Sequence, residues 1–152
     1  MSGDRPLRVL IVEDEVLLAT ELEYLVAASG AEPVGHAMSS PEAVDLAEQL
    51  HPDLALVDVN LGEGESGVDA ARTMIDRWGA LVLFLTANLM RIPRDFAGAC
   101  GAMSKPYSEH QLRSAIRFLQ ECLGEGRACR RPPPGLMLSP VYAERWGLPQ
   151  AA

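Results

Sequence analysis

The stretch Asp53-Leu-Ala-Leu-Val-Asp58 places four consecutive apolar residues directly before a carboxylate. A short apolar run without alternation is typical of a strand covered on both faces, as in a parallel sheet. The side chain of Asp58 therefore stands at the end of a predicted buried strand. Because a carboxylate is costly to desolvate there, we expect a cation or hydrogen-bond donors to meet it.

Other apolar runs also end in polar groups. We predict five strands, at residues 7–12, 33–37 (a weak edge strand), 54–57, 81–85 and 101–104. The first strand is followed by Glu13 and Asp14, the third by Asp58, the fourth by Thr86 and the fifth by Lys105. The second has no such polar group after it. Helical patterns separate these runs. They extend from Leu18 to Ser29, Ser40 to Leu50, Ser66 to Trp78, Asn88 to Ala99 (short or irregular, because it contains Pro93) and Ser108 to Leu119.

Alternating strands and helices predict an α/β fold with an open, doubly wound parallel sheet of five strands. Right-handed crossovers place the carboxyl ends of all the strands at one edge of such a sheet, which is where ligands bind. The polar groups after four of the five strands are therefore predicted to form one site.

Three carboxylates in that site, from Glu13, Asp14 and Asp58, would repel one another. At about 4 Å and an effective dielectric near 20, each pair costs about 4 kcal/mol. Either the acids are partly protonated or a divalent cation holds them. Mg²⁺ prefers oxygen ligands and keeps several of its waters, so it suits Asp14 and Asp58, with Glu13 as a direct or water-mediated ligand and the backbone carbonyl of Asn60 as a further ligand. The pattern offers no Cys or His for a softer metal.

Lys105 is the one lysine among 13 basic residues, so this position favours a compact point charge over a guanidinium. A carboxylate, a hydroxyl and an ammonium beside Mg²⁺ suit phosphoryl transfer. Asp58 would be the nucleophile and form an acyl phosphate. Lys105 would contact one phosphoryl oxygen, and the Thr86 hydroxyl with the Ala87 amide would contact another.

Composition excludes some classes of protein. The chain has 152 residues and a formal charge of −8, which argues against direct nucleic-acid binding. No apolar run approaches the length of a membrane span, and residues 1–6 lack the apolar core of a signal peptide. The three cysteines lack metal-ligand spacing, so we expect reduced thiols and a cytoplasmic location.

The C-terminal part differs in composition. We expect one domain over residues 1–123 and a Pro-rich tail over 124–152 that has too little apolar sequence for a core of its own. Residues 136–146 could form one turn or a short helix. Such a segment could dock on a partner or on the chain's own sheet edge, or the tail could be a disordered extension.

From Leu7 to Leu123, the chain resembles the response-regulator receiver domains of two-component signalling. The resemblance rests on Glu13-Asp14, Asp58 after its apolar run, Thr86-Ala87 and Lys105-Pro106, in this order and at these spacings. It implies a flavodoxin-like sheet of strand order 2-1-3-4-5 with helices on both faces. It also implies that Asp58 accepts phosphate from a histidine kinase or a histidine phosphotransfer protein, and that Thr86 moves toward the phosphoryl group.

The resemblance carries finer expectations. The Lys105-Pro106 bond is expected to be cis, and Asn60 and Asn88 lie where family members set the lifetime of the phosphorylated state. The family's usual strand-five aromatic is replaced by Ala102 or Met103, whereas Tyr107 follows Pro106 as in an atypical Lys-Pro-Tyr subset. We therefore expect a softer switch, in which residues 87–100 gain order on phosphorylation.

The leading hypothesis is a stand-alone receiver, a monomer or weak homodimer, that signals or shuttles phosphate through contacts with an output protein whose identity the sequence leaves open. It has no enzymatic activity beyond Mg²⁺-dependent self-phosphorylation and autodephosphorylation. An aspartyl phosphatase is one alternative, but it needs an acid or base two residues after Asp58, where Asn60 stands. A phosphate-independent adaptor is the other.

Overall fold

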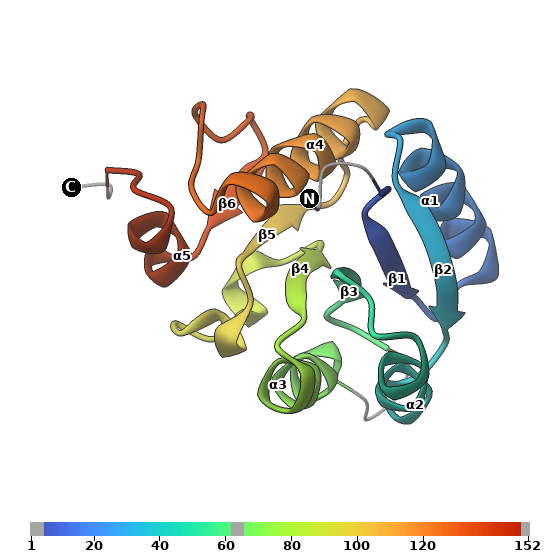
Figure 1. Cartoon of the computed structure of the whole chain (residues 1–152). Helices are drawn as coiled ribbons and strands as arrows, with labels where there is room; N and C mark the ends of the chain where they lie inside the picture. The colour runs from blue at the N-terminus through green and yellow to red at the C-terminus, as the bar shows by residue number, and fades with distance from the viewer. Residues whose placement is uncertain (1–4, 62–65, 150–152) are drawn as a thin grey trace.

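The computed structural model describes residues 5–61 and 66–149. One sheet lies between two pairs of helices, α1 with α4 on one face and α2 with α3 on the other (Figure 1). The strands are β1 (Arg8–Val12), β2 (Glu32–Ala37), β3 (Leu54–Asp58), β4 (Leu81–Thr86), β5 (Gly101–Ser104) and β6 (Leu136–Leu138). The helices are α1 (Val16–Ala28), α2 (Ser40–Leu50), α3 (Gly67–Trp78), α4 (Glu109–Glu125) and α5 (Pro140–Arg145), with 3₁₀ turns η2 (Leu89–Arg91) and η3 (Phe96–Gly98).

The sheet has the order β2-β1-β3-β4-β5-β6. Its first five strands are parallel and confirm the predicted fold class and strand order. The prediction of five strands omitted β6, which pairs antiparallel with β5. A three-residue strand behind a proline-rich segment has no periodic pattern that the sequence could reveal.

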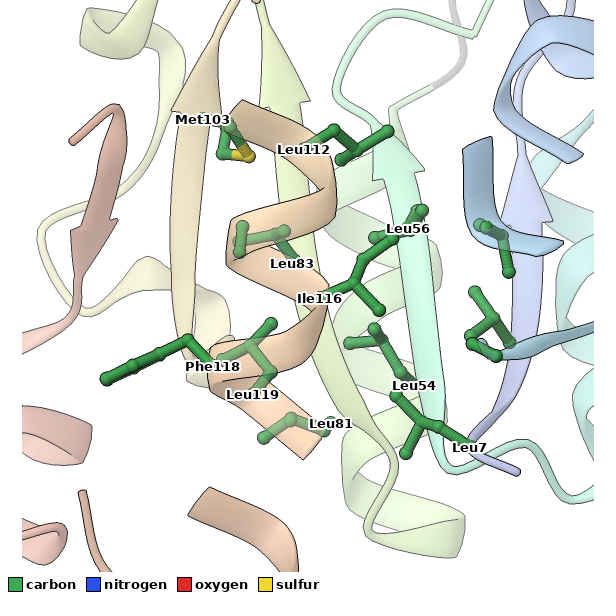
Figure 2. Close-up of a cluster of buried hydrophobic side chains, with 14 of the residues drawn as sticks. Leu7, Leu54, Leu56, Leu81, Leu83, Met103, Leu112, Ile116, Phe118 and Leu119 are labelled. Carbon is green, nitrogen blue, oxygen red and sulfur yellow. The ribbon is translucent and has the colours of Figure 1, made fainter. Parts of the chain in front are cut away.

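The central strand β3 is buried along its whole length. Leu54 and Leu56 belong to the hydrophobic cluster under α1 and α4, whereas Ala55 and Val57 belong to the cluster under α2 and α3. Figure 2 shows the first cluster, in which α4 lies over the sheet. Both faces are covered, which is why the run from Leu54 to Val57 lacks alternation.

Serine side chains cap the N-termini of α2, α3 and α4. Ser39, Ser66 and Ser108 each accept a hydrogen bond from a backbone amide in the first turn, and Ser108 forms a capping box with Gln111. In α1, the spacing of Leu18 with Leu22 and Leu25 predicts a buried position for Leu18, but the structure leaves it 36% exposed.

The connection from β4 to β5 contains no α-helix within its described residues, only η2 and η3. Pro93 lies between the two turns, and Phe96, Ala97 and Gly98 all have positive φ angles, of 55°, 53° and 86°. A right-handed helix cannot continue through such a backbone. The prediction of a short or irregular element between Asn88 and Ala99 is confirmed.

The C-terminal residues lie along β5 and against α4 (Figure 1). The ring of Trp146 is 4% exposed and meets the ring of Phe118 from α4 edge to face, at 6.3 Å between centroids. The Ser139 amide donates to the Cys100 carbonyl oxygen. The short helix expected within residues 136–146 is present as α5. Of the alternatives for this segment, the structure shows docking on the chain's own sheet edge.

None of the helices within residues 5–61 and 66–149 has the length and apolar character needed to cross a membrane.

Candidate functional site

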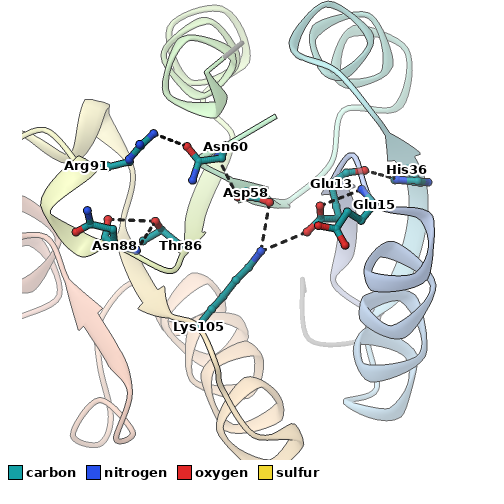
Figure 3. A network of polar contacts seen from close by, with 9 residues as sticks. All are labelled: Glu13, Glu15, His36, Asp58, Asn60, Thr86, Asn88, Arg91 and Lys105. Carbon is teal, nitrogen blue, oxygen red and sulfur yellow. Dashed lines mark hydrogen bonds and ion pairs between the residues drawn. The ribbon is translucent and has the colours of Figure 1, made fainter. Parts of the chain in front are cut away.

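The carboxyl ends of the parallel strands bring the predicted polar groups together, as Figure 3 shows. Glu13 directly follows β1, Asp58 is the last residue of β3, and Lys105 directly follows β5. Glu13 is 1% exposed and Asp58 7% exposed, so both carboxylates lie at the buried end of the sheet. Asp14 is half-buried beside them.

Glu13, Asp14 and Asp58 each offer a carboxylate oxygen within 4.8 Å of the others. An all-oxygen donor set of this kind suits a hard divalent cation, so the residues present fit Mg²⁺.

Asp58 has the partners that its buried position requires. The Asn60 backbone amide donates to Asp58 Oδ1 at 2.9 Å, and Lys105 Nζ donates to Asp58 Oδ2 at 3.2 Å. Lys105 Nζ also donates to Glu13 Oε1 at 3.4 Å. The single lysine of the chain thus bridges two buried carboxylates.

Burial dominates the titration of this cluster. It raises the pKa of Glu13 to about 7, with a further rise from the negative charge of Asp58, against a hydrogen bond from the Glu15 amide and the charge of Lys105. Burial alone would lower the pKa of Lys105, but the charges of Asp58 and Glu13 outweigh it and raise that pKa. The ammonium is therefore held in its charged form.

Thr86 is fully buried at the end of β4, and its hydroxyl is hydrogen-bonded to the backbone of Asn88. Thr86 Oγ1 accepts from the Asn88 amide at 3.0 Å and donates to the Asn88 carbonyl oxygen at 3.1 Å (Figure 3). The Asn88 side chain in turn accepts from the Met90 amide and begins η2. To reach a phosphoryl group on Asp58, the hydroxyl would have to leave Asn88.

The residues after Lys105 border the site. The Lys105–Pro106 peptide bond is cis, as the family resemblance implies. Pro106, Tyr107, Ala87 and Lys105 share a pocket of about 350 Å³ with α1. Burial raises the pKa of Tyr107 to about 12, and nearby carboxylates add to the rise. The phenol thus stays neutral at the rim.

Two residues at the site were missed by the sequence reasoning. Arg91 Nη1 donates to Asn60 Oδ1 at 2.7 Å, and His36 Nε2 lies 2.7 Å from the Glu13 carbonyl oxygen. The sequence around His36 indicates a surface position, but the residue is half-buried. No local pattern could identify Arg91, because its contact depends on the irregular turn that carries it.

Residues 9–117 match the family model described as the response regulator receiver domain. The chain belongs to this family. Its place in the Lys-Pro-Tyr subset stays a prediction. The receiver fold accounts for the parallel sheet and for the cluster of acids around Asp58.

The chain is similar to curated response regulators. It is 40% identical over 117 residues to the "Transcriptional regulatory protein PdtaR" of Mycobacterium tuberculosis, a match covering 74% of this chain and 56% of PdtaR. It is 39% identical over 88 residues to the "Phyllosphere-induced regulator PhyR" of Methylorubrum extorquens, covering 57% of this chain and 33% of PhyR. The match therefore spans only part of each relative.

A solved structure agrees with the fold. The receiver domain of PhyR from Erythrobacter litoralis, determined by NMR, superposes with a TM-score of 0.68 at 26% identity, over 85% of this chain and 97% of that one.

Proposed function

We propose that this chain is a phosphoacceptor that takes a phosphoryl group onto Asp58 from a phosphohistidine of a histidine kinase or histidine phosphotransfer protein. The phosphorylated receiver then acts as a signalling switch or a phosphate shuttle through contact with an output protein. One observation carries the proposal. The Asp58 carboxylate lies between the Lys105 ammonium and the Asn60 amide, and within 4.8 Å of carboxylate oxygens of Glu13 and Asp14.

The transfer needs a nucleophile and a means of neutralising charge. An oxygen of Asp58 attacks the phosphorus, a P–O bond forms, and the P–N bond to the donor imidazole breaks with its electron pair returning to the imidazole nitrogen. Lys105 moves from Asp58 to an oxygen of the transferred group. Thr86, released from Asn88, donates its hydroxyl to another oxygen, which is the event that couples phosphorylation to the connection after β4.

The acidic residues would hold the cation. Glu13, Asp14 and Asp58 supply side-chain oxygens, and the Asn60 backbone carbonyl is the proposed further ligand. When bound, Mg²⁺ neutralises the charge on the phosphoryl oxygens and so lowers the repulsion between the acids and the incoming group.

The test uses a small-molecule phosphodonor such as phosphoramidate, with Mg²⁺ or with EDTA, and intact-mass detection followed by site mapping. The wild-type chain is expected to gain one phosphoryl group in Mg²⁺ and none in EDTA. Asp58→Asn should remain unlabelled. Asp76→Asn makes the same chemical change at an exposed position of α3 and should be labelled like the wild type.

Each alternative has its own outcome in this experiment. Label at another residue, or no label in Mg²⁺, would contradict the phosphoacceptor proposal and favour the phosphate-independent adaptor. Rapid, continuing consumption of the donor would indicate a phosphatase. The amide of Asn60 argues against that second outcome, because it cannot transfer a proton to the leaving group or water.

A further inference from the structure

A guanidinium lies next to the proposed phosphorylation site without taking part in the transfer described above. Arg91 Nη1 donates to the side-chain oxygen of Asn60 at 2.7 Å, and the backbone amide of Asn60 donates to Asp58 Oδ1 at 2.9 Å. Figure 3 shows Asn60 between Asp58 and Arg91, with its side-chain oxygen directed at Arg91. Lys105 is hydrogen-bonded to Asp58 and to neither Asn60 nor Arg91. Asn60 thus contacts Asp58 through its main chain and Arg91 through its side chain.

The turn that presents Arg91 is anchored. Leu89 and Ile92 pack, partly buried, against the hydrophobic cluster under α2 and α3. The Ile92 amide donates to the Leu89 carbonyl oxygen at 3.2 Å, and the Asn88 side chain accepts from the Met90 amide at 3.0 Å. The Arg91 side chain itself is exposed, so its replacement should change stability little.

Loss of the acyl phosphate is the reaction that this contact would affect. A water oxygen attacks the phosphorus, the P–O bond to Asp58 breaks, the carboxylate leaves with the electron pair, and a proton from the water passes to the phosphate or to solvent. A hydrogen-bond acceptor near the water speeds this attack by orienting it. The Asn60 side-chain oxygen is such an acceptor, and it is engaged instead by a charge-assisted hydrogen bond from Arg91.

We propose that Arg91 is a positioning residue that lengthens the life of phosphorylated Asp58 by holding the Asn60 side-chain oxygen away from the attacking water. The inference rests on the proposed phosphoacceptor function. It assigns to Arg91 an effect on dephosphorylation that is separate from the rate of phosphorylation.

The experiment follows the decay of the acyl phosphate after the phosphodonor is removed, with Mg²⁺ present. Arg91→Met should shorten the half-life about three- to tenfold, the factor that one hydrogen bond supports. Its rate of phosphorylation should stay close to that of the wild type. Arg91→Lys keeps a donor and should recover part of the half-life. Arg94→Met removes a charge from an exposed arginine of the same segment and should leave the half-life unchanged.

A double-variant cycle shows whether Arg91 acts through Asn60. In an Asn60→Ala background, Arg91→Met should have no further effect on the half-life. An equal shortening in that background, or the same shortening in Arg94→Met, would mean that Arg91 acts by its charge alone and would overturn the inference. So would an unchanged half-life in phosphorylated, folded Arg91→Met.

The two proposals fail in different ways. If the wild-type chain is never phosphorylated on Asp58, both the proposed function and the role of Arg91 are contradicted. If the wild-type chain is phosphorylated but the acyl phosphate of Arg91→Met decays at the wild-type rate, only the role of Arg91 is contradicted.

Discussion

The carboxyl group of Glu13 has a strongly raised pKa, because it is 1% exposed and lies near the buried carboxylate of Asp58. Burial raises its pKa from 4.5 to about 7. An acid whose pKa is raised in the folded state stabilises the fold fully below the unfolded pKa. That contribution is lost as the pH rises through the folded value. Without Mg²⁺, Glu13 therefore opposes folding increasingly between pH 4.5 and pH 7.

We predict that Glu13→Gln, in EDTA, stabilises the chain relative to the wild type at pH 8 but not at pH 5. The shift corresponds to about 3 kcal/mol at most. Thermal unfolding at both pH values measures it. Adding Mg²⁺ at pH 8 should raise the melting temperature of the wild type more than that of Glu13→Gln, because the variant lacks one anionic ligand. The prediction would be contradicted if the melting temperatures of the two proteins in EDTA changed equally between pH 5 and pH 8.

At the scale of elements, the connection from β4 to β5 joins the site to the rest of the surface. Thr86 holds Asn88, and Asn88 begins η2, so a hydroxyl that moves to the phosphoryl group also releases the start of η2. Phe96 and Ala97 have left-handed backbones, which cost on the order of 1 kcal/mol each. The connection is anchored by the apolar side chains of Leu89, Ile92 and Phe96, but its backbone stores strain that a rearrangement could relieve.

We predict that amides of residues 87–100 gain hydrogen-exchange protection when a phosphoryl mimic such as beryllofluoride is added with Mg²⁺. The physical reason is that the Thr86 hydroxyl leaves Asn88 and the connection reorganises around the site. α2 lies away from this connection and should keep its exchange rates. Thr86→Ala should bind the mimic without the gain in protection. Unchanged protection of residues 87–100 in the wild type would contradict the prediction that this segment gains order on phosphorylation.

At the scale of the whole molecule, the C-terminal residues complete the sheet. β6 covers the edge of β5 that would otherwise expose unpaired backbone groups. It passes so close that a Cβ on Gly101 would collide with the Met137 carbonyl oxygen. Arg130 also pairs with Glu121 of α4 through two hydrogen bonds of 3.0 Å. The tail is therefore part of the fold that carries the site, although the site does not use it.

We predict that ending the chain after Gly126 lowers the melting temperature by about 5 °C or more, because Trp146 and Leu136 no longer cover α4 and β5. Phosphorylation of Asp58 should persist. Cys122 is buried, with its pKa raised to about 12 by burial, and should become reactive toward a thiol reagent in the truncated chain.

The full-length control is Cys129→Ser, which removes the exposed thiol and should leave no fast-reacting cysteine. Gly101→Ala in that background should reproduce the reactivity of Cys122 by displacing β6 alone. A truncated chain with the melting temperature and thiol reactivity of Cys129→Ser would show that the tail contributes nothing to the fold.

The sequence by itself determined the parallel sheet and the meeting of Glu13, Asp58 and Lys105. Buried strands are visible as apolar runs, and right-handed crossovers bring their carboxyl ends to one edge. The groups that end those runs must therefore meet, whatever the details of the loops.

Only the tertiary structure decided the orientation of the Thr86 hydroxyl, the contact between Arg91 and Asn60, and the pairing of β6 with β5. Each depends on backbone geometry in an irregular segment or on a partner far along the chain. A local pattern of apolar and polar residues records which face is buried, but it does not record where a loop places a side chain or which edge a short strand joins.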